Sequence, residues 1–201
     1  MGLRNPSASF ISTIFSRQGF DGAVKRIPSS LRRKAQKISL LLLDVDGVLT
    51  DGRIIVDDRG VETKQFHVRD GQGIALLLRG GIEVGLMTSR SSNSVRHRAK
   101  ELGIRLVHQG VRDKIKTYNA IKRKRSLQDE QIAYMGDDII DLPTLRAAGL
   151  ALSVADGWDG LRGTVDYVTN SPGGQGAVRE VAEMILKVQD KWTELIEKMH
   201  Q

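Results

Sequence analysis

Residues 40–50 read LLLLDVDGVLT, and this stretch decides the fold of the chain. Its four leucines form a continuous apolar run, which is typical of a β-strand buried on both faces of a sheet. The run ends at Asp44, and Gly47 allows the chain to turn soon afterwards. A strand of this kind, ending in acidic residues, predicts a parallel sheet whose carboxyl edge carries the functional residues.

Further apolar runs follow, and helical patterns separate them. We predict strands at residues 82–87, 106–108, 132–135 and 150–154, and helical stretches near residues 73–78, 92–102, 114–124 and 142–148. Strands that alternate with helices indicate βαβ units with right-handed crossovers. The expected fold class is therefore α/β, a Rossmann-like three-layer sandwich around a parallel central sheet.

The connection after the first strand has a different pattern. Residues 53–56 and 61–66 flank a turn at residues 57–60, which predicts a β-hairpin with Gly60 at positive φ. An insertion this small stands in place of a cap domain, so we expect an open site unless an oligomer partner covers it. Near the C-terminus we expect one helix, because apolar residues recur at helical spacing at Val178, Val181, Ile185, Val188, Trp192 and Ile196.

The formal charge of +7 is concentrated at the N-terminus. Residues 1–38 contain eight Lys/Arg and one acid, whereas the other 163 residues contain 23 of each sign. We therefore divide the chain into a basic arm (1–38), a folded domain (39–190) and a helix end or tail (191–201). The arm is interpreted as solvated or docked on a partner, with an organelle transit peptide and anion contact as alternatives. Nucleic-acid binding is unexpected, since no aromatic-basic alternation accompanies the charge.

The composition also limits the classes of function. Forty per cent hydrophobic and 27 per cent charged residues describe an ordinary globular protein. The sequence contains no cysteine, which excludes disulfides, thiolate metal sites and a cysteine nucleophile. No apolar run approaches the roughly 18 residues that a membrane span needs. We expect a cytoplasmic protein without a membrane span.

Two groups of carboxylates follow strands of the predicted sheet. Asp44 and Asp46 lie two residues apart, and Asp137 opens the sequence DDIID at residues 137–141 after another strand. Carboxylates this close repel one another unless a cation lies near them, and Mg²⁺ prefers oxygen ligands. An acidic turn and helix N-capping by Asp141 are the structural alternatives. Two acidic groups at separate strand ends nevertheless favour one shared metal site.

Two further residues have the position and chemistry to hold a phosphate. Thr88 follows the predicted strand at residues 82–87, and Lys114 opens a helix. Either residue alone has an ordinary structural explanation, as a strand-end hydroxyl or a solvated lysine. The sequence RDGQG at residues 69–73 places glycines and a cation before another helix, which suits an anion at a helix N-terminus.

In this order the motifs resemble the haloacid dehalogenase superfamily of phosphatases, in its capless subclass. The hairpin, the sequence FHVRDGQGI at residues 66–74, and the sequences at residues 166–169 and 173–181 are similar to the family of 3-deoxy-D-manno-octulosonate 8-phosphate phosphatases. The resemblance spans roughly residues 38–190. It implies a small-molecule sugar-acid phosphate as substrate and a role in lipopolysaccharide synthesis. It also implies a homotetramer in which neighbouring subunits close the sites.

The resemblance implies a role for each motif residue. Asp44 is the nucleophile that forms an aspartyl-phosphate, and Asp46 is the general acid and then the base. The Mg²⁺ ligands are the carboxylates of Asp44 and Asp137 and the backbone carbonyl of Asp46, with Asp138 or Asp141 supporting them. Thr88 and Lys114 complete the catalytic group as a phosphate cradle. The implied substrate-binding residues are His67, Val68, Arg69, Asp70, Gly71, Arg90, Arg98 and Lys114.

The chain departs from the family pattern at His67, Ser89 and Ala75, where the family usually has Asn, Gly and Arg or Lys. The first and third positions lie in the substrate-binding stretch, so a nonulosonate 9-phosphate or another small phosphate ester is the alternative substrate. A non-catalytic regulatory or assembly module is a third hypothesis. Loss of the catalytic motif residues would favour that hypothesis. The sequence retains all five of them: Asp44, Asp46, Thr88, Lys114 and Asp137.

Overall fold

The computed structural model describes residues 27–199 of the chain. Within this range six strands form the central sheet: β1 (Leu40–Leu43), β4 (Glu83–Met87), β5 (Leu106–His108), β6 (Ile132–Met135), β7 (Leu150–Ser153) and β8 (Tyr167–Val168). Their order is β5-β4-β1-β6-β7-β8, and every neighbouring pair is parallel. The predicted parallel sheet is confirmed, and the short edge strand β8 is an addition to it.

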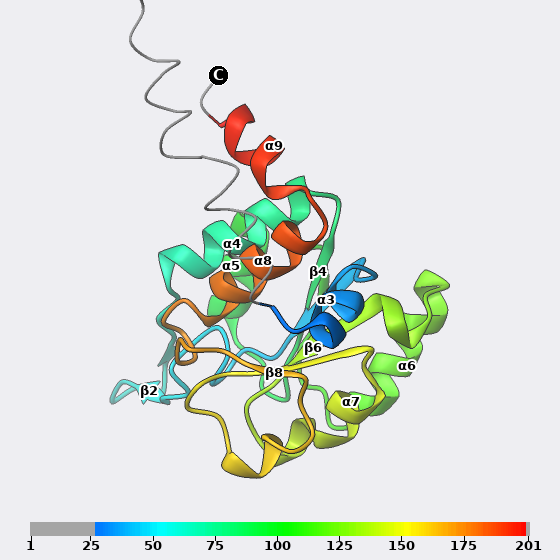
Figure 1. Cartoon of the computed structure of the whole chain (residues 1–201). Helices are drawn as coiled ribbons and strands as arrows, with labels where there is room; N and C mark the ends of the chain where they lie inside the picture. Colours follow the sequence, from blue (N-terminus) through cyan, green and yellow to red (C-terminus); the bar gives the residue numbers. More distant parts are fainter. Residues whose placement is uncertain (1–26, 200–201) are drawn as a thin grey trace, which may run out of the picture.

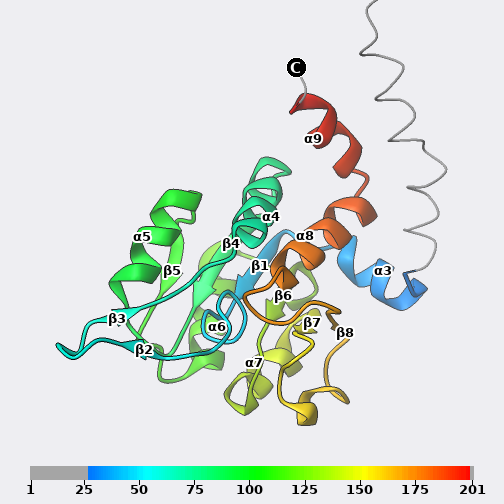
Figure 2. The same ribbon diagram turned by 90° about the vertical axis from the view of Figure 1, so that its left-hand side faces the viewer.

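Helices cover both faces of this sheet, as Figures 1 and 2 show. On one face lie α3 (Ser29–Ala35), α4 (Val68–Arg79), α5 (Asn93–Leu102) and α8 (Ala177–Val188), and on the other lie α6 (Lys114–Arg125) and α7 (Leu142–Ala147). In the described part of the chain, three single-turn 3₁₀ helices complete the connections: η1 (Asp129–Gln131), η2 (Ile139–Asp141) and η3 (Asp159–Leu161). The result is the expected three-layer α/β sandwich.

The leucines of β1 belong to two hydrophobic cores. Leu41 and Leu43 pack into the core under α4 and α8, whereas Leu40 and Leu42 pack into the core under α6 and α7. All four side chains have no solvent exposure. Because successive side chains of a strand point to opposite faces, an uninterrupted apolar run is what a strand between two helical layers requires.

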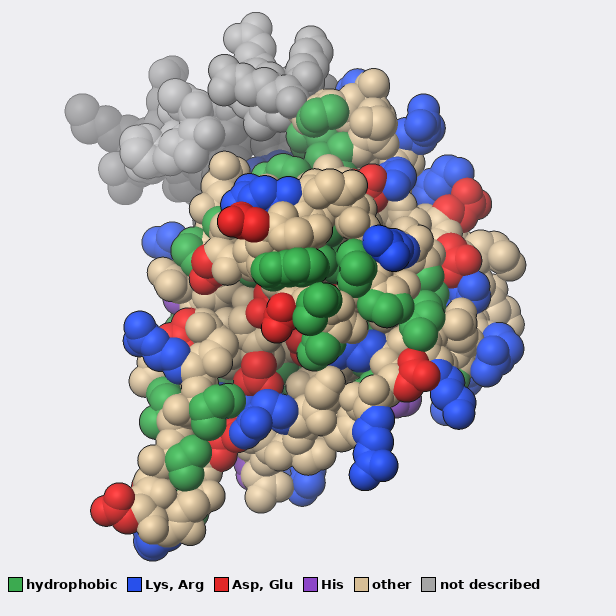
Figure 3. Space-filling view, turned by 90° about the horizontal axis from the view of Figure 1, so that it is seen from below, with side chains coloured by type: hydrophobic (Ala, Val, Ile, Leu, Met, Phe, Trp, Pro, Cys, Tyr) green, Lys and Arg blue, Asp and Glu red, His purple; other side chains and the backbone are tan. Residues whose placement is uncertain are grey.

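The inserted hairpin is antiparallel and shorter than the sequence predicted. Its strands are β2 (Ile55–Val56) and β3 (Glu62–Thr63), and Gly60 adopts a φ of 77° at the turn. The hairpin protrudes from the body, and hydrophobic side chains are visible on its surface (Figure 3). Few of its side chains reach the core, so only a short ladder of main-chain pairs forms.

The prediction of one continuous C-terminal helix is wrong. Helix α8 ends at Val188, and α9 (Trp192–Lys198) begins after a turn in which Asp190 has a φ of 58°. The Gln189 side chain donates hydrogen bonds to the carbonyls of Ala35 (3.0 Å) and Ile38 (2.8 Å). These contacts hold the residue after α8 against the end of α3 and the segment that follows it. The helix ends here, although the apolar residues of the sequence continue at helical spacing.

Part of the predicted basic arm is folded against the domain. Leu31 and Ala35 of α3 are buried in the core that contains α8. The apolar patch of the arm around Phe10, Ile14 and Phe20 lies outside the described residues, and the division of the chain at residues 38 and 190 stays a prediction. Within residues 27–199, no helix combines the length and apolar character that crossing a bilayer requires.

Candidate active site

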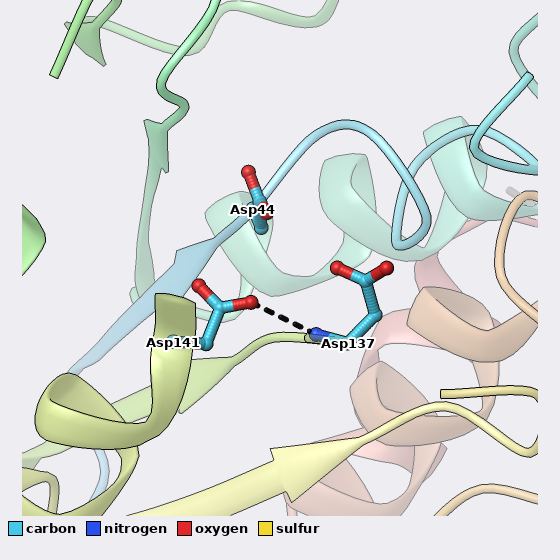
Figure 4. A group of neighbouring side chains, drawn as sticks. All are labelled: Asp44, Asp137 and Asp141. Carbon is cyan, nitrogen blue, oxygen red and sulfur yellow. Dashed lines mark hydrogen bonds between the residues drawn. The ribbon is translucent and has the colours of Figure 1, made fainter. Parts of the chain in front are cut away.

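Side chains from separate strands meet at the carboxyl edge of the sheet. Asp44 directly follows β1, Thr88 follows β4, and Asp137 lies two residues after β6. Lys114 is the first residue of α6, and Asp141 ends η2. Figure 4 shows that the three carboxylates point into one space between the strand ends. The structure therefore brings together the two acidic groups that lie far apart in the sequence.

Lys114 connects two of these carboxylates. Its Nζ lies 2.8 Å from Asp44 Oδ2 and 2.6 Å from Asp141 Oδ1. The Tyr134 hydroxyl also donates a hydrogen bond to Asp141 Oδ1. These side chains are buried, so the ion pairs form where solvent screens them little. Burial opposes the charge of Lys114, but Asp44 and Asp141 outweigh it and raise the pKa of the ammonium.

The carboxylate cluster has the character of a cation site. Ligand atoms of Asp44, Asp137 and Asp141 all lie within 4.8 Å of one another. Burial, together with the charges of Asp44 and Asp141, raises the pKa of Asp137 to about 8. Burial likewise raises the pKa of Asp44 to about 6, although Lys114 counteracts it. One cation is insufficient for three acids, and a divalent ion with oxygen ligands fits the remaining charge.

The turn after Asp44 depends on a glycine. Gly47 has a φ of 86°, and a Cβ at this position would lie 1.9 Å from Asp137 Oδ2. Glycine therefore allows both the left-handed turn and the close approach of the second acidic loop. Asp141 holds that second loop, because its Oδ2 accepts hydrogen bonds from the amides of Asp137 (3.0 Å) and Asp138 (3.2 Å).

Asp46 lies in the same loop, but its side chain is not part of the carboxylate cluster. The Asp46 carboxylate pairs with Lys64, a residue just after β3 that sequence reasoning missed. The sequence contains one signal that could have drawn attention to Lys64. Alternate side chains of a strand point to the same face, so Lys64 shares a face with Glu62. Thr88 is 2% exposed, and its Oγ accepts a hydrogen bond from the Arg90 amide (3.3 Å).

The predicted substrate-binding residues are spread over several environments. His67 caps α4, with Nδ1 accepting from the Arg69 amide (3.2 Å), and Val68 is exposed. Asp70 is almost wholly buried, and it accepts hydrogen bonds from the amides of Gly176 (3.1 Å) and Arg179 (2.8 Å). The Asp70 carboxylate thus ties α4 to α8.

The remaining arginines and the glycine of this set lie in three different places. Arg69 lines a groove of about 490 Å³ beside α8, away from the carboxylate cluster. Arg98 pairs with Glu101 (2.9 Å) and lies 5.9 Å from the Phe66 ring centroid. Gly71 faces Arg98, which a Cβ there would meet at 2.2 Å. Arg90 pairs with Glu62 of the hairpin and is half exposed.

No family model matches the chain, but individual proteins do. The chain is 44% identical over 159 residues to 3-deoxy-D-manno-octulosonate 8-phosphate phosphatase of Yersinia pestis, covering 79% of this chain and 85% of that protein. It is also 44% identical over 161 residues to the enzyme of the same name in Escherichia coli K12, covering 80% and 86%.

Solved structures agree with these relatives. The Moraxella catarrhalis phosphatase of that name, in complex with magnesium ion, phosphate ion and KDO, has a TM-score of 0.82 at 43% identity, covering 84% of this chain and 97% of that one. A putative haloacid dehalogenase superfamily hydrolase (subfamily III A) of Legionella pneumophila has a TM-score of 0.82 at 40% identity, covering 86% and 95%. The chain belongs to the 3-deoxy-D-manno-octulosonate 8-phosphate phosphatase family, within the haloacid dehalogenase superfamily.

Proposed function

We propose that this protein is a Mg²⁺-dependent phosphatase that hydrolyses 3-deoxy-D-manno-octulosonate 8-phosphate to 3-deoxy-D-manno-octulosonate and phosphate. The observation that carries the proposal is the cluster of Asp44, Asp137 and Asp141 at the sheet edge where ligands bind, with Lys114 paired to the first and the last of them. Two relatives named for this activity, each 44% identical over about four-fifths of the chain, support it.

Asp44 is the nucleophile of the proposed reaction. A carboxylate oxygen of Asp44 bonds to phosphorus while the ester bond to the sugar breaks, and Asp46 gives its proton to the departing sugar oxygen. In the second step Asp46 takes a proton from water, the water oxygen bonds to phosphorus, and the Asp44–phosphorus bond breaks. Thr88 and Lys114 hold the phosphoryl oxygens during both displacements.

The metal-binding residues of the proposal are the carboxylates of Asp44 and Asp137 and the backbone carbonyl of Asp46. A Mg²⁺ held by these groups would neutralise charge on the phosphoryl group, so that an anionic nucleophile could approach it. Asp141 is assigned the supporting role, because both of its oxygens already accept hydrogen bonds. Asp138 instead caps η2 through the Ile139 amide (2.7 Å).

The sugar-acid part of the substrate is assigned to the residues before and within α4 and to the arginines near the hairpin. Arg90 has the exposure and charge to meet a carboxylate, and arginine forks bind carboxylates in a bidentate manner. His67, Val68, Arg69, Asp70, Gly71 and Arg98 complete the set implied by the family resemblance. We further propose a cytoplasmic homotetramer that acts in lipopolysaccharide synthesis.

Phosphate release from a panel of esters tests the function. The panel contains 3-deoxy-D-manno-octulosonate 8-phosphate, a nonulosonate 9-phosphate and simple phosphate esters, each with Mg²⁺ and with a chelator. We expect the highest kcat/KM with the octulosonate ester and no turnover without metal. Equal turnover of all esters would contradict the sugar-acid assignment, and activity in the chelator would contradict the metal requirement.

A further inference from the structure

We propose that Lys64 is a positioning residue that fixes the acid–base carboxyl group of Asp46 in its working orientation. The inference rests on the proposed function, in which Asp46 exchanges the proton with the leaving oxygen and with water. The inserted hairpin would then contribute to the active site of its own subunit, because Lys64 directly follows β3 of the hairpin.

The contacts of Lys64 are those of an ammonium group built into the site. Its side chain is 1% exposed, and its Nζ pairs with Asp46 Oδ1 and lies 3.0 Å from Glu62 Oε1. A buried ammonium is costly unless it is paired, so the two acids hold Lys64 in one place. Lys64 in turn restrains one oxygen of Asp46, the residue before Gly47 in the loop after β1.

The two oxygens of Asp46 have different surroundings. Oδ1 is occupied by Lys64, whereas Oδ2 is buried and has no hydrogen-bond partner among the described residues. A buried oxygen without a partner is unfavourable unless a ligand supplies the missing hydrogen bond. Because Lys64 holds Oδ1, the carboxyl group presents Oδ2 as the atom that exchanges the proton with the leaving group or water.

Glu62 connects this pair to the substrate-binding region. Its carboxylate contacts Lys64 and also accepts a hydrogen bond from Arg90. Arg90 is half exposed, and it is the arginine proposed to bind the sugar-acid carboxylate. The order Asp46–Lys64–Glu62–Arg90 therefore places the proton-exchanging group and the substrate-binding arginine on one chain of ion pairs.

Steady-state kinetics of four variants test the proposal. Lys64→Met removes the ammonium at nearly constant length, Lys64→Arg keeps a cation, and Glu62→Gln removes the charge that anchors Lys64. Lys116→Met on α6 is the control, because Lys116 is an exposed lysine outside the site. Each is assayed with 3-deoxy-D-manno-octulosonate 8-phosphate and with 4-nitrophenyl phosphate, whose leaving group needs little protonation.

For Lys64→Met we expect kcat with the sugar ester to fall by roughly 10²-fold, with KM within about twofold of wild type. The loss should be smaller with the aryl ester, Lys64→Arg should recover part of it, and Lys116→Met should match wild type. Glu62→Gln should lower kcat in the same sense, which keeps the test valid if Lys64→Met does not fold. Equal losses on both esters, or an unchanged kcat, would overturn the proposal. Wild-type activity of Asp46→Asn would instead refute the acid–base role in the proposed function.

Discussion

Lys114 Nζ lies 2.8 Å from Asp44 Oδ2, so the proposed nucleophile is already paired with a cation in the folded protein. The other Asp44 oxygen, Oδ1, accepts a hydrogen bond from the Val45 amide (2.7 Å). Together these contacts fix the carboxylate at the end of β1 and stabilise its charge in a buried position. The same lysine pairs with Asp141, and it therefore links the two acidic loops of the site.

Replacing Lys114 with methionine should destabilise the protein. Asp44 and Asp141 would be left as buried carboxylates without their shared cation, and breaking a buried pair in this way costs roughly 3–5 kcal/mol. Urea denaturation of Lys114→Met and of the exposed control Lys116→Met measures the free energy of unfolding. A loss below about 1 kcal/mol, the size of a surface pair, would contradict the structural role of Lys114.

Magnesium binding should strengthen with pH up to about 8. The folded-state pKa of Asp137 is raised from 3.8 to about 8, so this acid is protonated at lower pH and must lose its proton to bind a metal. The Kd for Mg²⁺ should therefore rise by about tenfold for each pH unit below that value. Calorimetric titrations between roughly pH 6.5 and 9 measure this Kd.

The raised pKa of Asp137 also predicts how the stability of the metal-free protein changes with pH. Because the folded pKa of Asp137 lies above the unfolded value, the metal-free protein should lose stability as pH rises from about 4 to about 8. Asp137→Asn should remove the pH dependence of the Kd and of stability between about pH 6 and 8. The loss of stability between about pH 4 and 6 should remain, because the pKa of Asp44 is also raised, to about 6. Asp159→Asn is the control, since Asp159 is exposed and pairs with Arg162 outside the carboxylate cluster. A Kd that is constant over this range would contradict the assignment of Asp137.

Gly47→Ala should remove activity, while Gly81→Ala should leave it intact. Both glycines have positive φ, 86° and 75°, so both substitutions introduce backbone strain of about 1 kcal/mol or more. Only at Gly47 does the new Cβ collide with Asp137, a proposed metal ligand, whereas a Cβ at Gly81 meets no described atom within 4 Å. Phosphate release and Mg²⁺ affinity of the folded variants separate the two effects. Equal losses of activity and Mg²⁺ affinity in Gly47→Ala and Gly81→Ala would show that backbone strain, and not the collision with Asp137, causes the effect.

Polar substitutions on the hairpin should dissociate the proposed tetramer. Ile54, Val56 and Val61 are each about half exposed, and apolar side chains exposed together mark interaction surfaces. Light scattering of the double variant Ile54→Ser, Val56→Ser should report a smaller species than the wild-type protein. Met199→Ser, at an exposed apolar position at the end of α9 and outside the proposed site, serves as the control. A wild-type protein that is monomeric at assay concentrations would refute the tetramer.

The parallel sheet was predictable because its signal is strong and local. A run such as residues 40–43 has few alternatives to a doubly buried strand, and the acids that follow two strands mark the carboxyl edge. The clustering of Asp44 with Asp137 follows from the same topology. In such a sheet, residues far apart in sequence meet because the strand ends share one edge.

Other features depend on tertiary contacts that no local pattern contains. The break after α8 arises where Gln189 binds the backbone beside α3, although the apolar spacing of the sequence continues. The motif around Asp70 gives no sign that its carboxylate accepts hydrogen bonds from amides of the loop before α8 and of α8 itself. The pairing of Lys64 with Asp46 requires the hairpin to fold back over the loop, which its sequence does not specify.

The most direct test of the central claim is phosphate release from 3-deoxy-D-manno-octulosonate 8-phosphate, with Mg²⁺, by the wild-type protein and by Asp44→Asn. The substitution keeps the size of the side chain and removes the nucleophilic carboxylate. We predict that the wild-type protein releases phosphate and that the folded variant is slower by at least about 10³-fold. Turnover by Asp44→Asn close to the wild-type rate would contradict the account.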